Sequence, residues 1–186
     1  MKKYLFIILL CIGLVSCGGP EPRKPIKVKS GNFYKASAER NKSLLAKEEA
    51  YIQKLIAMDS ANTYQNSASG SWYHYTQKNK TTDYVPQTDD LVTMTYAVLS
   101  LENDTIYSFE DIGIVKYKVD KQELFPGLRN SVKLLKEGET ATFLYPSSLA
   151  FGYHGDGKKI GTNIPIKSTI KIFKIDKDSV NVQKLN

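Results

Sequence analysis

The stretch that decides the fold is residues 125–152, FPGLRNSVKLLKEGETATFLYPSSLAFG. Pro126 and Gly127 mark the start of a helix, and Gly138 marks its end. The apolar positions between them recur at i, i+4 and i+7: Leu128, Val132 and Leu135. Beyond the helix, apolar and polar residues alternate over 140–145, which is the period of a strand, until Pro146 stops it. The stretch therefore predicts one short helix followed by a strand.

Further strands are expected on both sides of this helix, at residues 71–76, 91–99, 105–109, 117–119 and 168–175. The longest, 91–99, is apolar on both faces, which suggests the centre of a sheet. Many strands with a single helix predict an α+β fold, in which an antiparallel β-sheet wraps around one short helix. The glycine-rich loop 152–161 lacks the Gly-Lys-Ser/Thr ending of a phosphate-binding loop, so no nucleotide site is expected.

An amphipathic helix is predicted in front of this domain, over residues 37–61. Its apolar residues fall in pairs at helical spacing: Leu44, Leu45, Tyr51, Ile52, Leu55 and Ile56. Charged residues lie between them and are assigned to the solvent face: Glu39, Lys42, Lys47, Glu48 and Lys54. The apolar stripe can cover the chain's own C-terminal domain, a second copy of the helix or a partner, and packing on its own domain is favoured slightly.

The N-terminus predicts export and lipid attachment. Residues 1–16 resemble a signal peptide, with Lys2 and Lys3 before an apolar run that is too short for the roughly 20 residues of a membrane-spanning helix. The segment 14–17, LVSC, resembles a bacterial lipobox, in which Cys17 is acylated and becomes the first residue of the mature chain. The alternative is an ordinary signal peptide that happens to contain Cys17. The expected location is the cell membrane or outer membrane, lipid-anchored and facing the periplasm.

Composition limits the remaining organisation and chemistry. Residues 17–36 carry glycine, proline and charge with little apolar content, which predicts a flexible tether. Residues 17–85 hold 11 basic and 6 acidic side chains, whereas 86–186 hold 13 of each, so the basic excess belongs to the N-terminal part of the mature chain. The sequence has no basic stripe with interleaved aromatic residues, so nucleic-acid binding is not expected. His74 and His154 have no ligand-type neighbour at a metal-site spacing, so neither a metal nor a cofactor is expected.

Two pairs of carboxylates adjoin turns. Asp89 and Asp90 precede the long strand, and Glu110 and Asp111 follow the strand at 105–109. Their position favours solvated loops over acid–base catalysis. The sequence has more aromatic and aliphatic residues around the turns than the core of one helix and a small sheet requires. The surplus permits an apolar pocket.

In order and spacing, these residues resemble the FKBP family of peptidyl-prolyl cis/trans isomerases. The resemblance rests on 125–152, on Ile164-Pro165 before Ser168-Thr169, and on the strands at 92–96 and 104–108. It covers about residues 71–178 and implies isomerisation of X-Pro bonds in polypeptide substrates, with macrolides as further ligands. The lipobox and basic helix in front further resemble the FKBP-like lipoproteins associated with gliding motility in the Bacteroidetes.

The resemblance also implies a site. The residues expected to carry isomerisation are Tyr96, Tyr107, Phe125, Leu128, Phe151 and Ile164. Those expected to complete substrate binding are Val115, Tyr117, Leu124, Phe143, Leu149 and Ile172, with Phe173 as an alternative to Ile172. Within this set the Phe125 backbone N–H would bind a substrate carbonyl, and Leu128 would form the floor beneath the proline ring.

Three positions depart from the family pattern. Ser108 stands where an aspartate is usual, with Glu110 or Asp111 as substitutes from nearby. Phe151 replaces a tyrosine whose hydroxyl donates to bound ligand, and Val115 lies where an aromatic edge often sits. Two hypotheses therefore stay open: an isomerase that helps exported or envelope proteins fold, and a catalytically weak binding module or chaperone in a membrane-associated assembly.

Overall fold

The computed structural model describes residues 30–179, with side chains from Tyr34 onward. The predicted signal peptide 1–16, Cys17, the tether up to residue 29 and residues 180–186 of the predicted domain lie outside the described residues. The chain divides into two compact units, Met1–Ser37 and Ala38–Asn186. Within the first unit the described residues are helical, and the second contains every other element described below.

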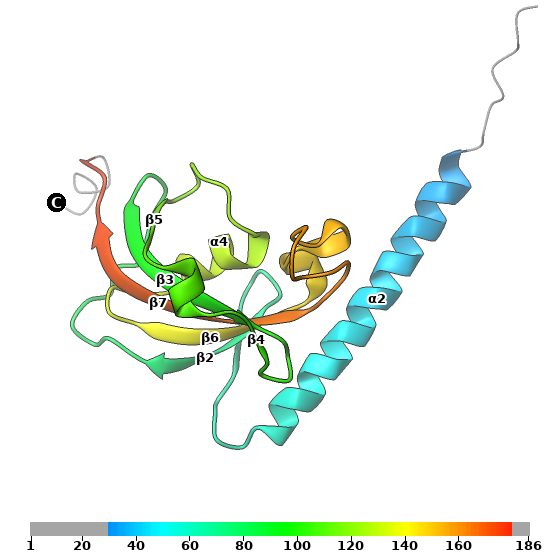
Figure 1. Cartoon of the computed structure of the whole chain (residues 1–186), viewed down its shortest axis with the longest axis horizontal. Helices are drawn as coiled ribbons and strands as arrows, with labels where there is room; N and C mark the ends of the chain where they lie inside the picture. The colour runs from blue at the N-terminus through cyan, green and yellow to red at the C-terminus, as the bar shows by residue number, and fades with distance from the viewer. Residues whose placement is uncertain (1–29, 180–186) are drawn as a thin grey trace, which may run out of the picture. The chain divides into compact units, whose positions relative to one another are not determined.

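The second unit is built on one antiparallel sheet with the strand order β1-β2-β6-β7-β3-β4, and β5 pairs with β3 beside β4. Figure 1 shows the long strands curving around helix α4. The strands are β1 (Gln65–Asn66), β2 (Trp72–Gln77), β3 (Leu91–Leu99), β4 (Thr105–Tyr107), β5 (Val115–Lys118), β6 (Thr140–Tyr145) and β7 (Ile166–Asp176). The helices are α2 (Ser30–Met58), α3 (Phe109–Ile112) and α4 (Pro126–Val132), with 3-10 turns η1 (Ser147–Leu149) and η2 (Gly152–His154).

This architecture confirms the predicted α+β fold, and β3 has the predicted bounds. The expectation of a single helix in the C-terminal half is wrong, because α3, η1 and η2 add short turns of helix. α4 also ends at Val132 instead of continuing to Gly138, since the next N–H groups bond three residues back, from Leu134 to Ser131 and from Leu135 to Val132. Short turns of this kind carry too few residues to show a helical period.

The face of the sheet that holds α4, here called the α4 face, carries the main core. Leu128 and Val132 of α4 are fully buried against inward side chains of β3, β6 and β7. The Phe143 ring lies between two tyrosines, 5.0 Å from the Tyr73 ring centre and 5.9 Å from that of Tyr145. Burying each large apolar side chain contributes about 1.5 to 3 kcal/mol, so this face supplies most of the stability of the second unit.

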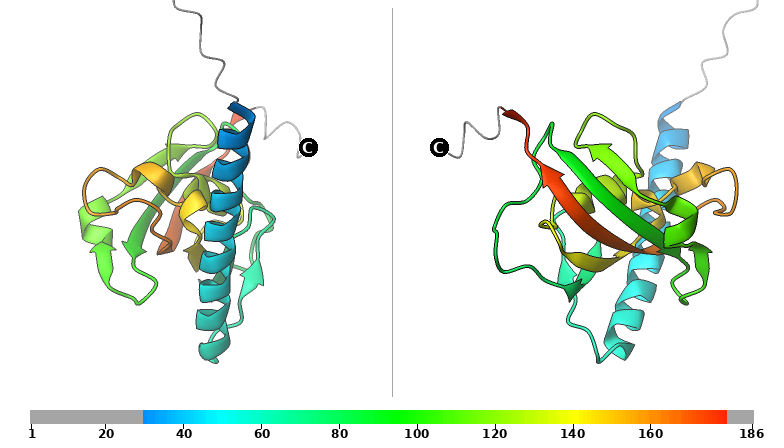
Figure 2. Two further views of the ribbon diagram at one scale, coloured as in Figure 1. Left: turned by 90° about the vertical axis from the view of Figure 1, so that its right-hand side faces the viewer. Right: turned by 60° about the vertical axis from the view of Figure 1, so that its left-hand side comes forward.

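The opposite face of the sheet, here called the α2 face, packs against α2 (Figure 2). Ile52 on the helix is fully buried with Trp72 of β2, Leu144 of β6 and Leu101. This confirms the expectation that the apolar stripe packs on the chain's own C-terminal domain. The helix begins at Ser30 instead of Ser37 and ends at Met58 instead of Ala61. No helix in residues 30–179 is long and apolar enough to cross a membrane.

Two carboxylates that the sequence predicts to lie on the solvent-exposed surface are buried in the structure. Glu48 lies in the apolar stripe of α2 and is 7% exposed. Asp90 is fully buried and accepts hydrogen bonds from the Tyr84 hydroxyl at 2.6 Å and the backbone N–H of Gln87 and Asp178, each at 2.8 Å. The solvated turn predicted for Asp90 is therefore wrong, because this side chain connects the start of β3 to the end of β7.

Candidate functional site

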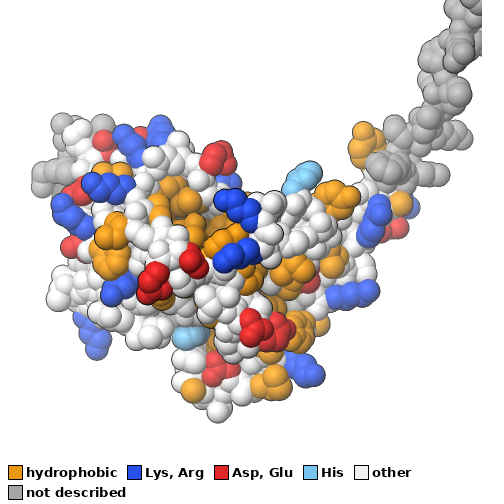
Figure 3. All heavy atoms as spheres, viewed as in Figure 1, with side chains coloured by type: hydrophobic (Ala, Val, Ile, Leu, Met, Phe, Trp, Pro, Cys, Tyr) orange, Lys and Arg blue, Asp and Glu red, His pale blue; other side chains and the backbone are white. Residues whose placement is uncertain are grey.

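Eleven of the twelve residues predicted for the site pack in or against one cluster on the α4 face. They come from segments far apart in sequence: Tyr96 from β3, Tyr107 from the end of β4, Phe125 from the start of α4 and Phe151 from the turn before η2. Figure 3 shows hydrophobic side chains gathered on this side of the molecule, over the region of α4, next to basic side chains. The fold thus brings the predicted residues together.

The predicted residues divide by exposure. Seven are partly buried: Tyr96, Tyr107, Val115, Leu124, Phe125, Leu149 and Phe151. Four present no more than 1% of their surface to solvent: Tyr117, Leu128, Phe143 and Ile172. A substrate can reach these four side chains only if neighbouring side chains move. Ile164 is 40% exposed and lies outside the cluster.

The structure also distinguishes Ile172 from its neighbour Phe173. Ile172 pairs with Met94 and is fully buried, whereas Phe173 is exposed and lies under the Lys171 ammonium, 5.3 Å from the ring centre. A register shift beside Thr93 leaves Phe173 outside the pairing. Ile172 is therefore the residue that packs in the hydrophobic cluster on the α4 face.

Phe125 lies at the centre of an aromatic cluster, defined here as Tyr96, Phe125, Tyr145 and Phe151. Its ring centre is 5.0 Å from that of Phe151, 5.7 Å from Tyr145 and 6.3 Å from Tyr96. Phe125 is the residue before the helical turn of α4, and its backbone is extended there. Within residues 30–179 its N–H forms no hydrogen bond. Such an apolar surface can bind an apolar ring of a ligand, and the unused N–H beside it can donate a hydrogen bond to a carbonyl of the same ligand.

Tyr96 supplies a second polar group at the aromatic cluster. Burial raises the pKa of its phenol above the ordinary value of 10.0. The hydroxyl therefore stays protonated at neutral pH, and none of the described residues accepts its proton. It is free to donate a hydrogen bond to a ligand.

The carboxylate beside Tyr107 comes from an unexpected segment. The Tyr107 hydroxyl donates to Asp156 in the glycine-rich loop, with 2.5 Å between the oxygens, and the Lys159 ammonium lies 4.7 Å from the Tyr107 ring centre. Lys159 also donates to the Ile106 carbonyl at 2.9 Å. Sequence reasoning missed Asp156 because 49 residues separate it from Tyr107 and no pattern links the two.

Hydrogen bonds hold Asp156 in its charged form. Burial alone would raise the pKa of this carboxyl, but donation from the Tyr107 hydroxyl and from the N–H groups of Ile160 and Lys158 outweighs burial and lowers the pKa below 3.8. Gly155 shapes the same loop, since its φ is +65° and a Cβ there would lie 2.3 Å from the Ile160 carbonyl oxygen. The loop is therefore closed on itself and attached to β4.

Neither acidic residue suggested for the missing aspartate fills that role. Ser108 caps α3: its hydroxyl accepts from the Asp111 N–H at 3.1 Å, and the Asp111 carboxylate accepts from the Ser108 N–H at 2.9 Å. This capping box uses both side chains. Glu110 lies on the exposed surface of the same short helix. Asp156 is the carboxylate that contacts the pocket aromatic Tyr107.

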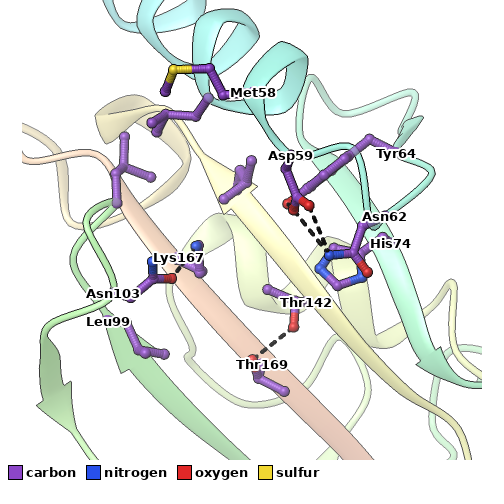
Figure 4. A pocket seen from close by; sticks show the side chains of 13 residues that line it. Met58, Asp59, Asn62, Tyr64, His74, Leu99, Asn103, Thr142, Lys167 and Thr169 are labelled. Carbon is purple, nitrogen blue, oxygen red and sulfur yellow. Dashed lines mark hydrogen bonds between the residues drawn. The ribbon is translucent and has the colours of Figure 1, made fainter.

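A separate cavity of about 420 Å³ lies on the α2 face (Figure 4). Asp59 lies at one end and accepts hydrogen bonds from Asn62 and Tyr64, and Thr142 bonds to Thr169 across the sheet. Its lining shares no residue with the predicted site. No group of three or more potential metal ligands occurs in residues 30–179.

Residues 82–176 match the family model for FKBP-type peptidyl-prolyl cis-trans isomerases. The chain belongs to this family. The match spans β3 to β7, and so contains every residue of the aromatic cluster.

A curated relative and two solved structures are similar to this FKBP chain. The relative is Probable FKBP-type peptidyl-prolyl cis-trans isomerase FkpA of Neisseria meningitidis serogroup B, 32% identical over 149 residues, which are 80% of this chain and 52% of the relative. The chain thus spans about half the length of that protein. FkpA from Escherichia coli matches at a TM-score of 0.57 and 18% identity, over 95% of this chain and 82% of that one. A peptidyl-prolyl cis-trans isomerase from Pseudomonas syringae matches at a TM-score of 0.56 and 17% identity. The match covers 73% of this chain and 96% of that one. At these identities the two structures show the fold.

Proposed function

We propose that this chain is a peptidyl-prolyl cis/trans isomerase whose aromatic cluster binds the proline ring of polypeptide substrates. The observation that carries this proposal is the arrangement around Phe125, where three aromatic rings lie within 6.3 Å and the backbone N–H is unused. The partly buried side chains of Val115, Leu124 and Leu149 extend the apolar surface around it. Membership in the family and the match to the Neisseria protein support the same activity.

The chemistry of X-Pro isomerisation suits this site. Rotation about the bond has a barrier of about 18 to 20 kcal/mol, because the planar amide is stabilised by resonance. An apolar surface disfavours the charge-separated planar amide relative to the twisted one, and hydrogen bonds that strengthen in the twisted state lower the barrier. Phe125 N–H can donate to a substrate carbonyl and Tyr96 can donate its hydroxyl proton. No acid, base or metal is required.

The test is an isomerisation assay on a short X-Pro peptide with the full chain and two matched variants. Phe151→Leu removes a ring 5.0 Å from Phe125, whereas Tyr153→Leu removes a ring two residues further on that is 74% exposed. We expect kcat/KM to fall by about ten-fold for Phe151→Leu and to stay unchanged for Tyr153→Leu. Equal effects of the two variants, or a wild-type rate at background, would count against the proposal.

A specific observation favours a second function, that of a proline-binding module with little turnover. Phe151 brings no hydroxyl to the aromatic cluster, and Ser108 and Asp111 are used in the capping box of α3. Fewer polar contacts are then available to stabilise the twisted amide. A module would bind the X-Pro peptide at the aromatic cluster while leaving its isomerisation rate at background, so peptide titration alongside the assay separates the two functions.

The cellular setting proposed for the chain rests on its sequence. Cys17 would carry lipid that anchors the domain to the cell membrane or outer membrane on the periplasmic side, so the substrates would be exported or envelope proteins, including those of gliding motility. Metabolic labelling with a fatty acid tests the anchor: the wild type should be labelled and Cys17→Ser should not. Label retained by Cys17→Ser would exclude that attachment site.

A further inference from the structure

Glu48 makes an isolated polar contact within the apolar stripe of α2. Its Oε2 accepts a hydrogen bond from the Ser147 backbone N–H at 2.8 Å, and its Oε1 accepts one from the Ser147 hydroxyl at 2.7 Å. Both residues are buried, and 99 positions separate them in sequence. One residue of η1 thus occupies both oxygens of a carboxylate on α2.

A buried carboxylate is costly unless hydrogen bonds or an opposite charge satisfy it. Among the described residues, no Lys or Arg lies within ion-pair distance of Glu48. Its neighbour in the stripe is Ile52, one turn along, which packs in an apolar cluster. An apolar side chain at position 48 would leave the buried N–H and hydroxyl of Ser147 without an acceptor, so the carboxylate is what holds Ser147 in place.

Ser147 begins the segment that carries Phe151. The Ala150 N–H donates to the carbonyls of Ser147 and Pro146, so the backbone from 146 to 150 is a closed turn. Phe151 follows directly, with its ring 5.0 Å from that of Phe125. A shift of Ser147 therefore moves Phe151 relative to the aromatic cluster.

The same segment lies tightly against the start of α4. A Cβ at Gly127 would lie 2.6 Å from the Tyr145 ring and 2.8 Å from the Leu149 carbonyl oxygen, so the chain after β6 contacts the backbone beside Phe125 directly. The Asn163 N–H donates to the Gly152 carbonyl at 2.8 Å, which attaches the residue before Ile164 to this segment. Displacement of the turn would reach three predicted pocket residues, Phe125, Phe151 and Ile164.

A small cavity lies beside the contact between Glu48 and Ser147. This cavity of about 170 Å³ adjoins Glu48 and Ser147, with Leu44 and Leu45 of α2 on one side and Tyr153 on the other. Packing around the carboxylate is therefore incomplete on the side of this cavity.

From these contacts we infer that Glu48 is a positioning residue for isomerisation: through Ser147, it fixes the turn that presents Phe151 to the aromatic cluster. The inference rests on the proposed function and names a further residue for it, outside residues 82–176 matched by the family model. Helix α2 is then part of the isomerase as a support for the pocket wall. Detachment of α2 from the domain would lower turnover without altering any residue that touches substrate.

The test compares Glu48→Gln with Glu49→Gln, an adjacent glutamate outside the buried contact, in the full chain. Gln keeps the size of the side chain but has one acceptor oxygen instead of two, so its NH2 group can bond Ser147 only if the hydroxyl turns to accept, and both contacts lose the strength that a carboxylate acceptor gives. We expect Glu48→Gln to lower kcat/KM by about ten-fold, mainly through kcat, and Glu49→Gln to leave it unchanged. Ser147→Ala should act in the same direction, and the double variant should be no worse than the stronger single variant, because both remove one contact.

A second readout keeps the inference separate from the proposed function. In ¹⁵N NMR spectra, Glu48→Gln should shift the amide resonances of Phe151 and Phe125, whereas Glu49→Gln should not. Loss of activity is assigned to positioning only if Trp72, the one tryptophan of the chain, keeps its emission and so reports a docked α2. A wild type without isomerase activity overturns the proposed function. A folded Glu48→Gln chain with unchanged Phe151 resonances and unchanged kcat/KM overturns the role of Glu48. If Glu48→Gln folds poorly, the same two measurements on Ser147→Ala decide, and unchanged values there overturn the role of the contact.

Discussion

On the α4 face of the sheet, buried side chains from β3, β5, β6, β7 and α4 form one continuous core, whereas on the α2 face four buried side chains and one carboxylate join α2 to the domain. The buried residues of the first face lie between Val92 and Ile175, with Tyr73 as the one exception, and therefore almost all within the segment matched by the family model. The second depends on contacts between residues far apart, such as Glu48 with Ser147. The comparison indicates that the α4 face determines the fold and the binding surface. The α2 face holds α2 against the sheet, and its contacts can be changed by substitution without removing the core of the α4 face.

The largest effect is expected on the α4 face. Phe143→Ala should lower the free energy of unfolding by about 3 to 5 kcal/mol, because it removes a fully buried ring stacked between Tyr73 and Tyr145. Denaturant unfolding followed by circular dichroism measures this loss. A loss below 1 kcal/mol would mean that this core does not dominate stability.

A smaller and more local effect is expected on the α2 face. Ile52→Ala should cost about 2 to 5 kcal/mol of the contact between α2 and the sheet, since Ile52 is fully buried among Trp72, Leu101 and Leu144. Trp72 emission should shift to the red at lower denaturant than the near-ultraviolet signal of the stacked tyrosines. If both signals change together in the variant, the two faces unfold as one unit and the comparison fails.

The aromatic cluster offers a test that adds a group instead of removing one. Phe151→Tyr places a hydroxyl next to Phe125 and restores a donor to bound ligand, so a macrolide of the kind that FKBP domains bind should gain about 0.5 to 1.5 kcal/mol. Calorimetric titration of the wild type and the variant gives the difference. An unchanged affinity in a folded Phe151→Tyr chain would show that residue 151 does not contact the ligand.

The smallest effect concerns pH and the α2 face. Burial is the main cause that lowers the pKa of His74 below 6.5 in the folded chain, against the opposite influence of Asp59. A depressed folded pKa means that the unfolded chain binds the proton first, so the full stability is present above pH 6.5 and declines as the pH falls through the folded value. We expect the melting temperature to drop modestly from pH 7 to pH 5 in the wild type, and less in His74→Gln. An equal drop in both would assign the pH dependence to another group.

The sequence was sufficient for the parts of the molecule in which neighbouring residues determine structure. The bounds of β3 followed from its apolar run, and α4 and β6 followed from their apolar periods, although α4 ends earlier than predicted. Tyr96, Phe125 and Phe151 of the aromatic cluster followed from the resemblance to the FKBP family, whereas Tyr145 was not among the residues expected for the site. Of the twelve residues expected for the site, only Ile164 lies outside the hydrophobic cluster on the α4 face.

The contacts of three carboxylates could not be predicted from the sequence, because each carboxylate bonds to a residue far along the chain. Glu48 contacts Ser147, Asp90 contacts Asp178 and Asp156 contacts Tyr107, at separations of 99, 88 and 49 residues. A charged residue in a periodic pattern is assigned to solvent, because its burial depends on a partner that the local sequence does not contain. These three positions were therefore assigned to solvent or overlooked.

The most direct test of the central claim is a ¹⁵N NMR titration of the full chain with a short X-Pro peptide, with exchange between its cis and trans signals followed in the same samples. The account predicts that catalytic amounts of the chain accelerate exchange, and that saturating peptide shifts the Phe125 amide, the unused donor at the aromatic cluster, and leaves the Glu102 amide on the α2 face unchanged. Exchange at the uncatalysed rate, or peptide shifts confined to the α2 face, would contradict it.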